Sequence, residues 1–369
     1  MKKNTKTLKE TFNEALISYK KSDFEAAENI CNKILNIDPN HFDSVLLAAS
    51  ICGGNRNFKK AKELLLKAVE IQPKNTTAYN NLGSACKELG ELAEAQAFYE
   101  KTLSINPNHT NANFNLALLF YHQKKIEKAK ALFEKTVEIQ PNFALAHFNL
   151  GNLFAEMKEY KKAKNFYEKA IKIRPNFPGA LNNLGLAYRS LNDYKNSINC
   201  YKEAIKIAPN HAGAHSNLGR ALTELGDFKN AITTLEKATK LEPKNLYNFY
   251  YLSELNKDLL NKELINKVKD IVGNKSSTKR DLAYGNFLIA AYERKEKNYK
   301  KELENLTQAH KYFFHLRENK FNLGVKYSFE DLLQISDQAH LVIKNKENKY
   351  KVKPIFIIGV PRCGSTLVE

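Results

Sequence analysis

Residues 144–177, ALAHFNLGNLFAEMKEYKKAKNFYEKAIKIRPNF, form one unit of a pattern that runs through most of the chain. The next 34 residues, PGALNNLGLAYRSLNDYKNSINCYKEAIKIAPNH at 178–211, keep the proline and the Asn-Leu-Gly triplet at the same places. The proline itself recurs every 34 residues, at Pro39, Pro73, Pro107, Pro141, Pro175, Pro209 and Pro243. A fixed period of this length indicates stacked two-helix units, each of which buries its apolar face against its neighbours.

Small and large residues alternate within each unit at fixed places. With residue 144 as position 1, position 20 carries Ala27, Ala61, Ala95, Ala129, Ala163, Ser197 and Ala231. Position 24 carries larger side chains, Leu65, Tyr99, Phe133, Tyr167, Tyr201 and Leu235. Small residues let the two helices of a unit cross closely, so position 20 predicts the crossing point. Gly90, Asn192 and Gly226 fall between the helices, where a left-handed residue is expected.

This pattern resembles the tetratricopeptide repeat, with seven units over residues 8–245 after an N-terminal tail at 1–7. The resemblance implies an all-α solenoid, a right-handed superhelix of helix pairs, that binds a protein or peptide in its concave groove. The first unit departs from the pattern, with Glu14 where Leu is usual. We expect this unit to be a terminal cap with one solvated face.

Asparagine recurs at position 6 of the units and is replaced only by Leu47 in the second. The members are Asn13, Asn81, Asn115, Asn149, Asn183 and Asn217. An amide offers a donor and an acceptor together, so such a ladder could bond both groups of a peptide backbone. In some tetratricopeptide proteins, including the glycosyltransferase that modifies Ser and Thr, a similar ladder holds extended peptide. The resemblance therefore implies a peptide site at Asn81, Asn115, Asn149, Asn183 and Asn217. The alternative is that these amides bond within the repeats of an Asn-rich chain.

Residues 246–343 are expected to form further helical hairpins and capping helices. Leu252 would occupy position 7 of one more first helix, and residues 276–299 and 300–320 read as a helical pair. The predicted apolar faces of that pair are Leu282, Phe287, Leu288 and Tyr292 on the first helix and Leu303, Leu306 and Phe313 on the second. Residues 328–345 predict another helix with Ser328 as its N-cap, and residues 344–353 a lysine-rich linker.

The last segment, PIFIIGVPRCGSTLVE at 354–369, differs in kind from the repeats. Residues 355–358 are an apolar run typical of a buried strand, and Gly359 and Gly364 bound a loop before a helix start. Such a loop can cradle a phosphate on its backbone N–H groups. The glycine spacing is that of the nucleotide P-loop, but Ser365 stands where its lysine would be. This difference argues against an ordinary P-loop ATPase or kinase.

The loop resembles the 5′-phosphosulfate-binding loop of sulfotransferases, above all tyrosylprotein sulfotransferases and bacterial proteins that join tetratricopeptide repeats to a sulfotransferase domain. The resemblance implies the co-substrate 3′-phosphoadenosine-5′-phosphosulfate and an acceptor hydroxyl, such as that of a protein tyrosine. It implies a catalytic role for Arg362, and cofactor contacts from Arg362, Cys363, Gly364, Ser365 and Thr366. Cys363 departs from the family pattern, in which Ser is usual. Residues 354–369 would then be the start of an incomplete α/β domain.

Two hypotheses for the whole chain follow. In the first, it is a fragment of a sulfotransferase whose repeats hold the acceptor, and by itself it is inactive. In the second, it is a non-catalytic scaffold for protein–protein interaction that carries a relic loop. In the family, the catalytic base and the 3′-phosphate site follow this loop, and residues 1–369 contain neither.

Composition excludes several other classes. The net charge of +18 is spread along the chain, which argues against a nucleic-acid footprint. No apolar run follows the basic N-terminus and none approaches the length of a membrane span, so we expect a cytoplasmic location. The five cysteines form no CxxC pair and are expected to be free thiols. The histidines follow the repeat spacing without a Cys or carboxylate cluster, so no metal site is expected.

Overall fold

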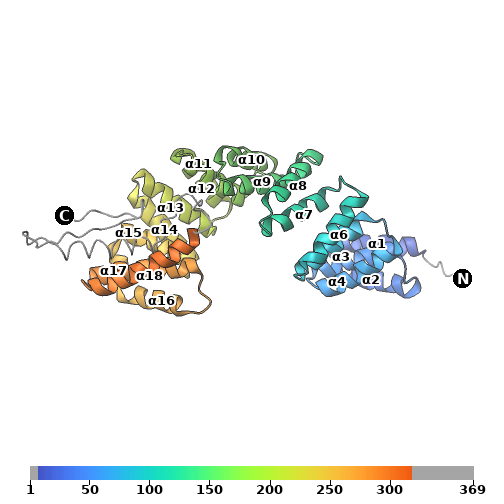
Figure 1. Cartoon of the computed structure of the whole chain (residues 1–369). Coiled ribbons are helices and arrows are strands. Elements are labelled where there is room, and N and C mark those ends of the chain that lie inside the picture. Colours follow the sequence, from blue (N-terminus) through green and yellow to red (C-terminus); the bar gives the residue numbers. More distant parts are fainter. Residues whose placement is uncertain (1–6, 318–369) are drawn as a thin grey trace, which may run out of the picture. The chain divides into compact units, whose positions relative to one another are not determined.

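The computed structural model describes residues 7–317, and every regular element among them is a helix (Figure 1). These residues belong to two compact units, with the division between Ile271 and Val272. The predicted helix at 328–345, the linker at 344–353 and the segment at 354–369 lie outside the described residues. The predicted α/β start therefore stays a prediction. No described helix has the length and apolar character that a membrane crossing requires.

The first unit contains seven helix pairs in chain order, and each helix packs on the next. The pairs are α1 Leu8–Lys20 and α2 Phe24–Ile37, α3 Phe42–Gly54 and α4 Phe58–Ile71, α5 Thr76–Glu88 and α6 Leu92–Ile105, α7 Thr110–His122 and α8 Ile126–Ile139, α9 Ala144–Glu156 and α10 Tyr160–Ile173, α11 Pro178–Ser190 and α12 Tyr194–Ile207, α13 Ala212–Leu225 and α14 Phe228–Leu241. Each pair fills one 34-residue unit, and the predicted all-helical solenoid of helix pairs is confirmed.

The small residues at position 20 are the points of closest helix crossing. All seven are buried, with at most 2% of the surface exposed. The contact between the two helices is tight in the units where position 8 is Gly. A Cβ added to Gly151 would lie 2.5 Å from Cε1 of Tyr167, and one added to Gly83 would lie 2.7 Å from Cε1 of Tyr99. Glycine is therefore needed there for space, because no side chain fits beneath the ring.

One residue with a left-handed backbone separates the two helices of every pair, at position 15. These residues are Ser22, Arg56, Gly90, Lys124, Lys158, Asn192 and Gly226, with φ between 59° and 86°. The sequence prediction is confirmed for Gly90, Asn192 and Gly226 and missed the other four. An unbranched side chain adopts this conformation at a cost of about 1 kcal/mol, which the packing of the two helices offsets.

Histidines before several first helices act as helix caps. Nδ1 of His109 accepts from the N–H of Ala112 at 3.2 Å, and Nδ1 of His211 accepts from that of Ala214 at 3.1 Å. Asn75 occupies the equivalent place and caps α5 through its side-chain oxygen. These residues therefore satisfy helix N–H groups that have no partner within the helix.

The array is followed by α15 (Leu246–Leu255), the short 3₁₀ helix η1 (Lys257–Leu259) and α16 (Lys262–Gly273). Leu252 is 2% exposed, as expected for position 7 of a further first helix. α15 packs on α14 as each earlier first helix packs on the helix before it. It therefore continues the row of first helices past the seventh repeat.

The second unit contains the predicted helical pair, α17 (Lys279–Lys295) and α18 (Tyr299–Arg317), which pack on each other. Leu288 is buried as predicted, but the expectation for Leu303 was wrong, because this side chain is 67% exposed. The neighbouring Glu302 is buried instead, where its carboxylate accepts a 2.6 Å hydrogen bond from Nε of Arg294. Leu303, one residue further along α18, faces solvent.

Candidate functional site

The ladder asparagines connect consecutive first helices. Nδ2 of Asn115 donates to Oδ1 of Asn80 in the repeat before it, at 3.2 Å. Nδ2 of Asn183 donates in the same way to Oδ1 of Asn152, at 2.8 Å. Position 6 of one repeat therefore lies beside positions 5 and 9 of the preceding one. We call the surface formed by positions 5, 6, 9, 12 and 13 of the first helices the first-helix face.

The other members of the ladder have different partners. Nδ2 of Asn217 donates to Oδ1 of Asn182 at 3.0 Å, and Nδ2 of Asn149 donates to the carbonyl of Leu145 in its own helix at 2.8 Å. Asn81 accepts from a neighbouring amide, and Asn13 is exposed. Each amide that bonds along the face uses one of its two N–H groups, and the second N–H stays available to a ligand. The amides thus bond within the array and retain groups for a ligand, so their assignment to a peptide site stays a prediction.

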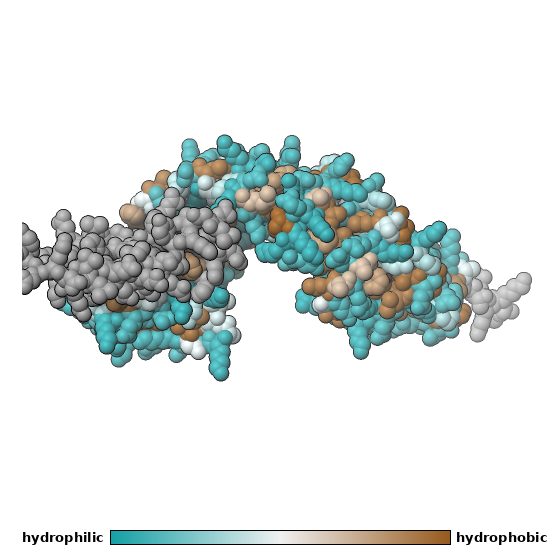
Figure 2. All heavy atoms as spheres, viewed as in Figure 1, coloured by the Kyte–Doolittle hydropathy of each residue, from teal (hydrophilic) through white to brown (hydrophobic). Residues whose placement is uncertain are grey.

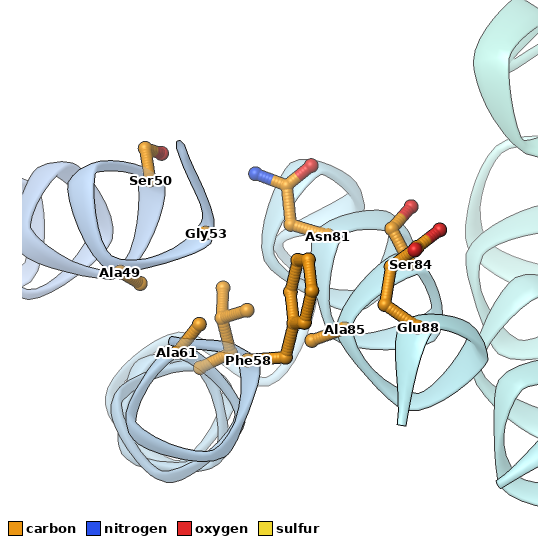
Figure 3. A pocket seen from close by; sticks show the side chains of 10 residues that line it. Ala49, Ser50, Gly53, Phe58, Ala61, Asn81, Ser84, Ala85 and Glu88 are labelled. Atoms are coloured by element: carbon orange, nitrogen blue, oxygen red, sulfur yellow. The ribbon is translucent and has the colours of Figure 1, made fainter. Parts of the chain in front are cut away.

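An open depression of about 230 Å³ lies on the first-helix face between the second and third repeats (Figure 3). Ser50 and Gly53 of α3 lie on one side, Asn81 and Ser84 of α5 lie on the other, and the ring of Phe58 from α4 stands between them. The lining is mostly apolar, with Leu65 at position 24 among its residues. Its size and polarity suit one aliphatic or aromatic side chain with polar groups at the edge.

A second depression, of about 280 Å³, lies three repeats further along, between the fifth and sixth repeats. It is built from equivalent positions, because Asn183 replaces Asn81, Tyr160 replaces Phe58 and Tyr167 replaces Leu65. The repeat therefore places similar hollows beside ladder asparagines at two points of one face. The second hollow is more polar at its walls, since tyrosines take the place of apolar residues.

The tyrosines around the second depression are neutral hydrogen-bonding groups. The Tyr167 hydroxyl donates to Oδ1 of Asn152 at 2.9 Å, and burial raises the pKa of this phenol. Burial, together with a hydrogen bond to Glu156, raises the pKa of Tyr121 to about 12. Both phenols therefore keep their protons at physiological pH, and the hollow is uncharged.

The first-helix face is almost free of unpaired charge over repeats three to seven. The helices α5, α7, α9, α11 and α13 contain six charged residues, Lys87, Glu88, Glu156, Arg189, Arg220 and Glu224. Five of these are in ion pairs, Lys87–Glu88 at 3.0 Å, Lys124–Glu156 at 2.9 Å and Arg189–Glu224 at 2.8 Å. The matching second helices, α6 to α14, contain 23 charged residues. Hydrophilic residues accordingly cover much of the visible surface of the repeats, with smaller apolar patches between them (Figure 2). The net positive charge thus lies mainly away from the first-helix face.

A cluster of metal-ligating groups, Cys86, Glu91 and Glu94, already holds a cation from the protein itself. Nζ of Lys62 lies 2.7 Å from a carboxylate oxygen of Glu91 and 2.7 Å from one of Glu94. These hydrogen bonds raise the pKa of Lys62, and burial raises the pKa of the Cys86 thiol to about 11. The cluster is therefore an ion-pair network around a protonated thiol.

The four cysteines within the described residues are free thiols, as expected. Cys31, Cys52 and Cys86 are buried, and Cys200 is half-buried. Burial raises the pKa of Cys31 and of Cys200 to about 11. A protonated, enclosed thiol is a poor nucleophile, so the structure gives no support to a catalytic role for these cysteines.

The residues assigned to phosphosulfate binding are in a part of the chain that the structure does not describe. Arg362, Cys363, Gly364, Ser365 and Thr366 all lie outside residues 7–317. Their assignment to sulfuryl transfer stays a prediction.

Family models described as tetratricopeptide repeat or TPR repeat match residues 42–75, 75–142, 144–177, 166–198, 185–223 and 212–245. Together these matches cover more than half of the chain. The chain is a tetratricopeptide repeat protein. The matches include no sulfotransferase family and none reaches residues 354–369. Among curated proteins no sequence matches this tetratricopeptide repeat protein.

Solved structures show the same fold. The structure of pilF from Pseudomonas aeruginosa is 21% identical, with a TM-score of 0.54 over 58% of this chain and 97% of that one. PilW, a type IV pilus biogenesis factor, is 20% identical, with a TM-score of 0.52 over 57% of this chain and 98% of that one. Cut9 in its hetero-tetramer with Hcn1 is 17% identical, with a TM-score of 0.50 over 81% of this chain and 55% of that one. At these identities the likeness concerns the fold alone.

Proposed function

We propose that this tetratricopeptide repeat protein binds an extended peptide segment of a partner protein on its first-helix face. The observation that carries the proposal is the pair of equivalent depressions, each beside a ladder asparagine, at Asn81 and at Asn183. An extended peptide presents backbone N–H and C=O groups in alternation and side chains at regular intervals. Amides along a row of helices can bond the backbone while the depressions accept side chains.

The weak charge of the face supports a peptide over a nucleic acid. Clustered Lys and Arg neutralise the phosphates of a nucleic acid. The counterions that this releases from the nucleic acid provide much of the binding free energy. Among the described residues of the first helices α5, α7, α9, α11 and α13, the only unpaired cation is Arg220. The lysines of the second helices are instead spread over the outside of each pair. A mostly uncharged ligand therefore fits the face best.

Gly53 allows a clean test of the first depression. A Cβ added there would meet nothing within 4 Å, and the residue lies at the rim of the hollow. Position 12 holds Tyr121 in the fourth repeat, so the lattice accepts a tyrosine at this place. Gly53→Tyr should fill the depression, and Gly53→Ala is the matched control that leaves it open.

The assay begins with an array of random peptides probed with the wild-type protein, and the tightest peptide is then titrated by fluorescence anisotropy. We expect Gly53→Tyr to weaken binding at least about tenfold, the loss of one well-buried side chain, while Gly53→Ala binds as the wild type does. Equal affinity for all three proteins would place the peptide elsewhere. Failure of every peptide to bind the wild type would reject peptide binding altogether.

A second candidate function is sulfuryl transfer from 3′-phosphoadenosine-5′-phosphosulfate. The sequence Gly359-Val360-Pro361-Arg362-Cys363-Gly364-Ser365-Thr366 favours it, because this loop resembles the family's phosphosulfate-binding loop. On this hypothesis Arg362 would offset the charge that develops on the transferring group, and the repeats would hold the acceptor protein.

The product nucleotide, adenosine 3′,5′-bisphosphate, tests this second candidate by calorimetric titration of the protein from the complete gene. Arg362→Ala should weaken nucleotide binding at least about tenfold, since a charged partner of the phosphate is lost. Lys237→Ala, on an exposed position of α14, is the control for the loss of one positive charge. Absence of nucleotide binding, or binding that does not depend on Arg362, would remove this candidate.

A reducing compartment such as the cytoplasm agrees with the thiols of the array. Its cysteines are free, and three of them are buried. Persistent disulfides form mainly in oxidising compartments, so we infer that the protein functions where thiols stay reduced. Localisation of a tagged protein by microscopy would test this inference.

A further inference from the structure

Each depression on the first-helix face is bordered by position 9 of one repeat and position 6 of the next. Ser50 and Asn81 border the first, and Asn152 and Asn183 border the second. Because α15 continues the row of first helices, the same arrangement recurs after the seventh repeat. There position 9 is Arg220 and position 6 is Tyr251. The ladder of amides is thus replaced at its end by a cation and a phenol ring.

Two tyrosines of α15 hold the Arg220 guanidinium. Its Cζ lies 4.7 Å from the ring centroid of Tyr251 and 5.1 Å from that of Tyr247. The two rings are themselves in edge contact, with centroids 4.8 Å apart. Stacking of this kind fixes the plane of the guanidinium and leaves its N–H edge for an acceptor.

No described residue neutralises this guanidinium. Nε of Arg220 is buried and has no hydrogen-bond acceptor among the described residues. Glu224, one turn further along α13, is engaged by Nε of Arg189, which lies 2.8 Å and 3.1 Å from its two carboxylate oxygens. Among the charged residues of the first helices α5, α7, α9, α11 and α13, Arg220 is therefore the only one without an ion-pair partner in the described part of the chain. A buried donor that lacks an acceptor loses stability, and an acceptor on a bound ligand would restore it.

We propose that Arg220 binds the side-chain carboxylate of an Asp or Glu in the peptide on the first-helix face. This inference rests on the proposed peptide binding and deepens it by defining a charged anchor on an otherwise neutral surface. Asn217, three residues earlier on the same helix, would bond the peptide backbone beside that acidic residue. Arg220 would then set the register of the peptide, because the other charges of the first helices α5, α7, α9, α11 and α13 are already in ion pairs.

A carboxylate fits this position better than a phosphate. A phosphorylated side chain carries about two negative charges and is usually held by several cations. The nearest second cation on the face, Arg189, is already paired with Glu224. A planar carboxylate matches the single N–H edge of one guanidinium and balances its single charge.

The test uses an array of random 12-residue peptides, blocked at both ends, in which every sequence also appears with Asp changed to Asn and Glu to Gln. The wild-type protein should select acidic peptides, and the matched amide peptides should bind at least about tenfold more weakly in solution. Arg220→Gln should remove this preference. Arg220→Lys should keep part of it, since the positive charge remains but the paired N–H donors of the planar guanidinium are lost. The control is Lys237→Gln, which removes one positive charge from α14 of the same repeat and should leave the preference intact.

The outcomes separate this inference from the function on which it rests. If the wild type binds peptides but acidic and amide versions bind equally, the role of Arg220 is wrong and peptide binding stands. A preference retained by Arg220→Gln would also overturn the inference. If only peptides with a free C-terminus bind, the anchor is for the terminal carboxylate, and if only phosphopeptides bind, it is for a phosphate; either result contradicts the proposal. Because the peptide-side comparison needs only the wild type, equal binding of the acidic and amide peptides would overturn the inference even if Arg220→Gln does not fold.

Discussion

The close contact between Gly151 and Tyr167 gives the sharpest test of how the array packs. In Gly151→Ala the new Cβ would lie 2.5 Å from Cε1, 2.6 Å from Cδ1 and 3.0 Å from Cζ of Tyr167. Ordinary carbon contacts are about 3.5–4.0 Å, so the ring or the helix must move. The ring cannot withdraw freely, because it is 2% exposed and its hydroxyl donates to Asn152 at 2.9 Å.

The expected cost follows from these contacts. Overpacking of a tight core costs about 1–3 kcal/mol, and loss of the tyrosine hydrogen bond about 1 kcal/mol more. The better helix propensity of Ala returns about 1 kcal/mol. Gly151→Ala should therefore lower the free energy of unfolding by about 1–3 kcal/mol. Gly53→Ala, where the Cβ meets nothing within 4 Å, should instead raise it by about 0.5–1 kcal/mol.

Urea denaturation followed by far-ultraviolet circular dichroism measures both changes. The fourth repeat supplies a rescue, since it pairs Ala117 with the buried Phe133 at the same two positions. The double variant Gly151→Ala with Tyr167→Phe should recover part of the lost stability, because a ring without the hydroxyl can shift aside. If Gly151→Ala were as stable as Gly53→Ala, the claim that glycine is needed here for space would be wrong.

Three further predictions concern caps, helix junctions and the ladder. Burial lowers the pKa of His109 and of His147 below the usual 6.5, so these histidines bind protons more readily in the unfolded chain. Stability should therefore be steady above about pH 7 and fall as the pH drops below about 6.5. His109→Asn should reduce the loss of stability with falling pH, measured in thermal melts, and should keep the cap, as Asn75 does. An unchanged dependence of stability on pH would contradict the role of His109. Lys158→Gly should raise the free energy of unfolding by about 1 kcal/mol, and Gly226→Ala should lower it by about as much, because both residues have positive φ. Urea titrations in which Lys158→Gly is destabilised or Gly226→Ala is stabilised would refute this prediction. Alanine at Asn115, Asn149 and Asn183 together should weaken peptide binding at least about tenfold while the circular dichroism spectrum stays helical; unchanged affinity would remove the ladder from the site.

The proline lattice predicted most of the fold because its cause is local and repeated. A proline that ends one unit and small residues that allow a helix crossing recur at every repeat, so one unit fixes the boundaries of the others. The same regularity predicted that position 6 forms a row across the first helices. The amide bonds of that row, such as Asn115 to Asn80, join residues of neighbouring repeats. Only the stacking geometry decides which of these atoms meet.

Other features were missed because tertiary packing overrides local preference. Lys158 and Arg56 adopt a left-handed backbone that their own propensity disfavours, since the packed helix pair imposes the turn. His109 was read only as a by-product of the repeat, although its place before a first helix is also that of the N-cap Asn75. Comparison with Asn75 could have found the cap. Leu303 was expected in a core, but Glu302 is the residue that is buried on α18, where it accepts a hydrogen bond from Arg294.

The depressions and the Arg220 anchor do not follow from the repeat pattern. They depend on which side chain stands at position 9 or 12, where Gly53, Asn152 and Arg220 differ in size and charge. A repeat pattern aligns these positions but does not show which of them leave a hollow. The structure was needed to find that two hollows share one face and that a cation stands at the equivalent place after the seventh repeat.

The location of a bound peptide tests the central claim most directly. A benzophenone side chain placed at residue 149 lies on the first-helix face, and one placed at residue 202 lies on an exposed position of α12, a second helix. After irradiation with the tightest peptide from the array, we predict that the first variant cross-links to the peptide and the second does not. Equal cross-linking from both, or cross-linking from residue 202 alone, would contradict a peptide site on the first-helix face.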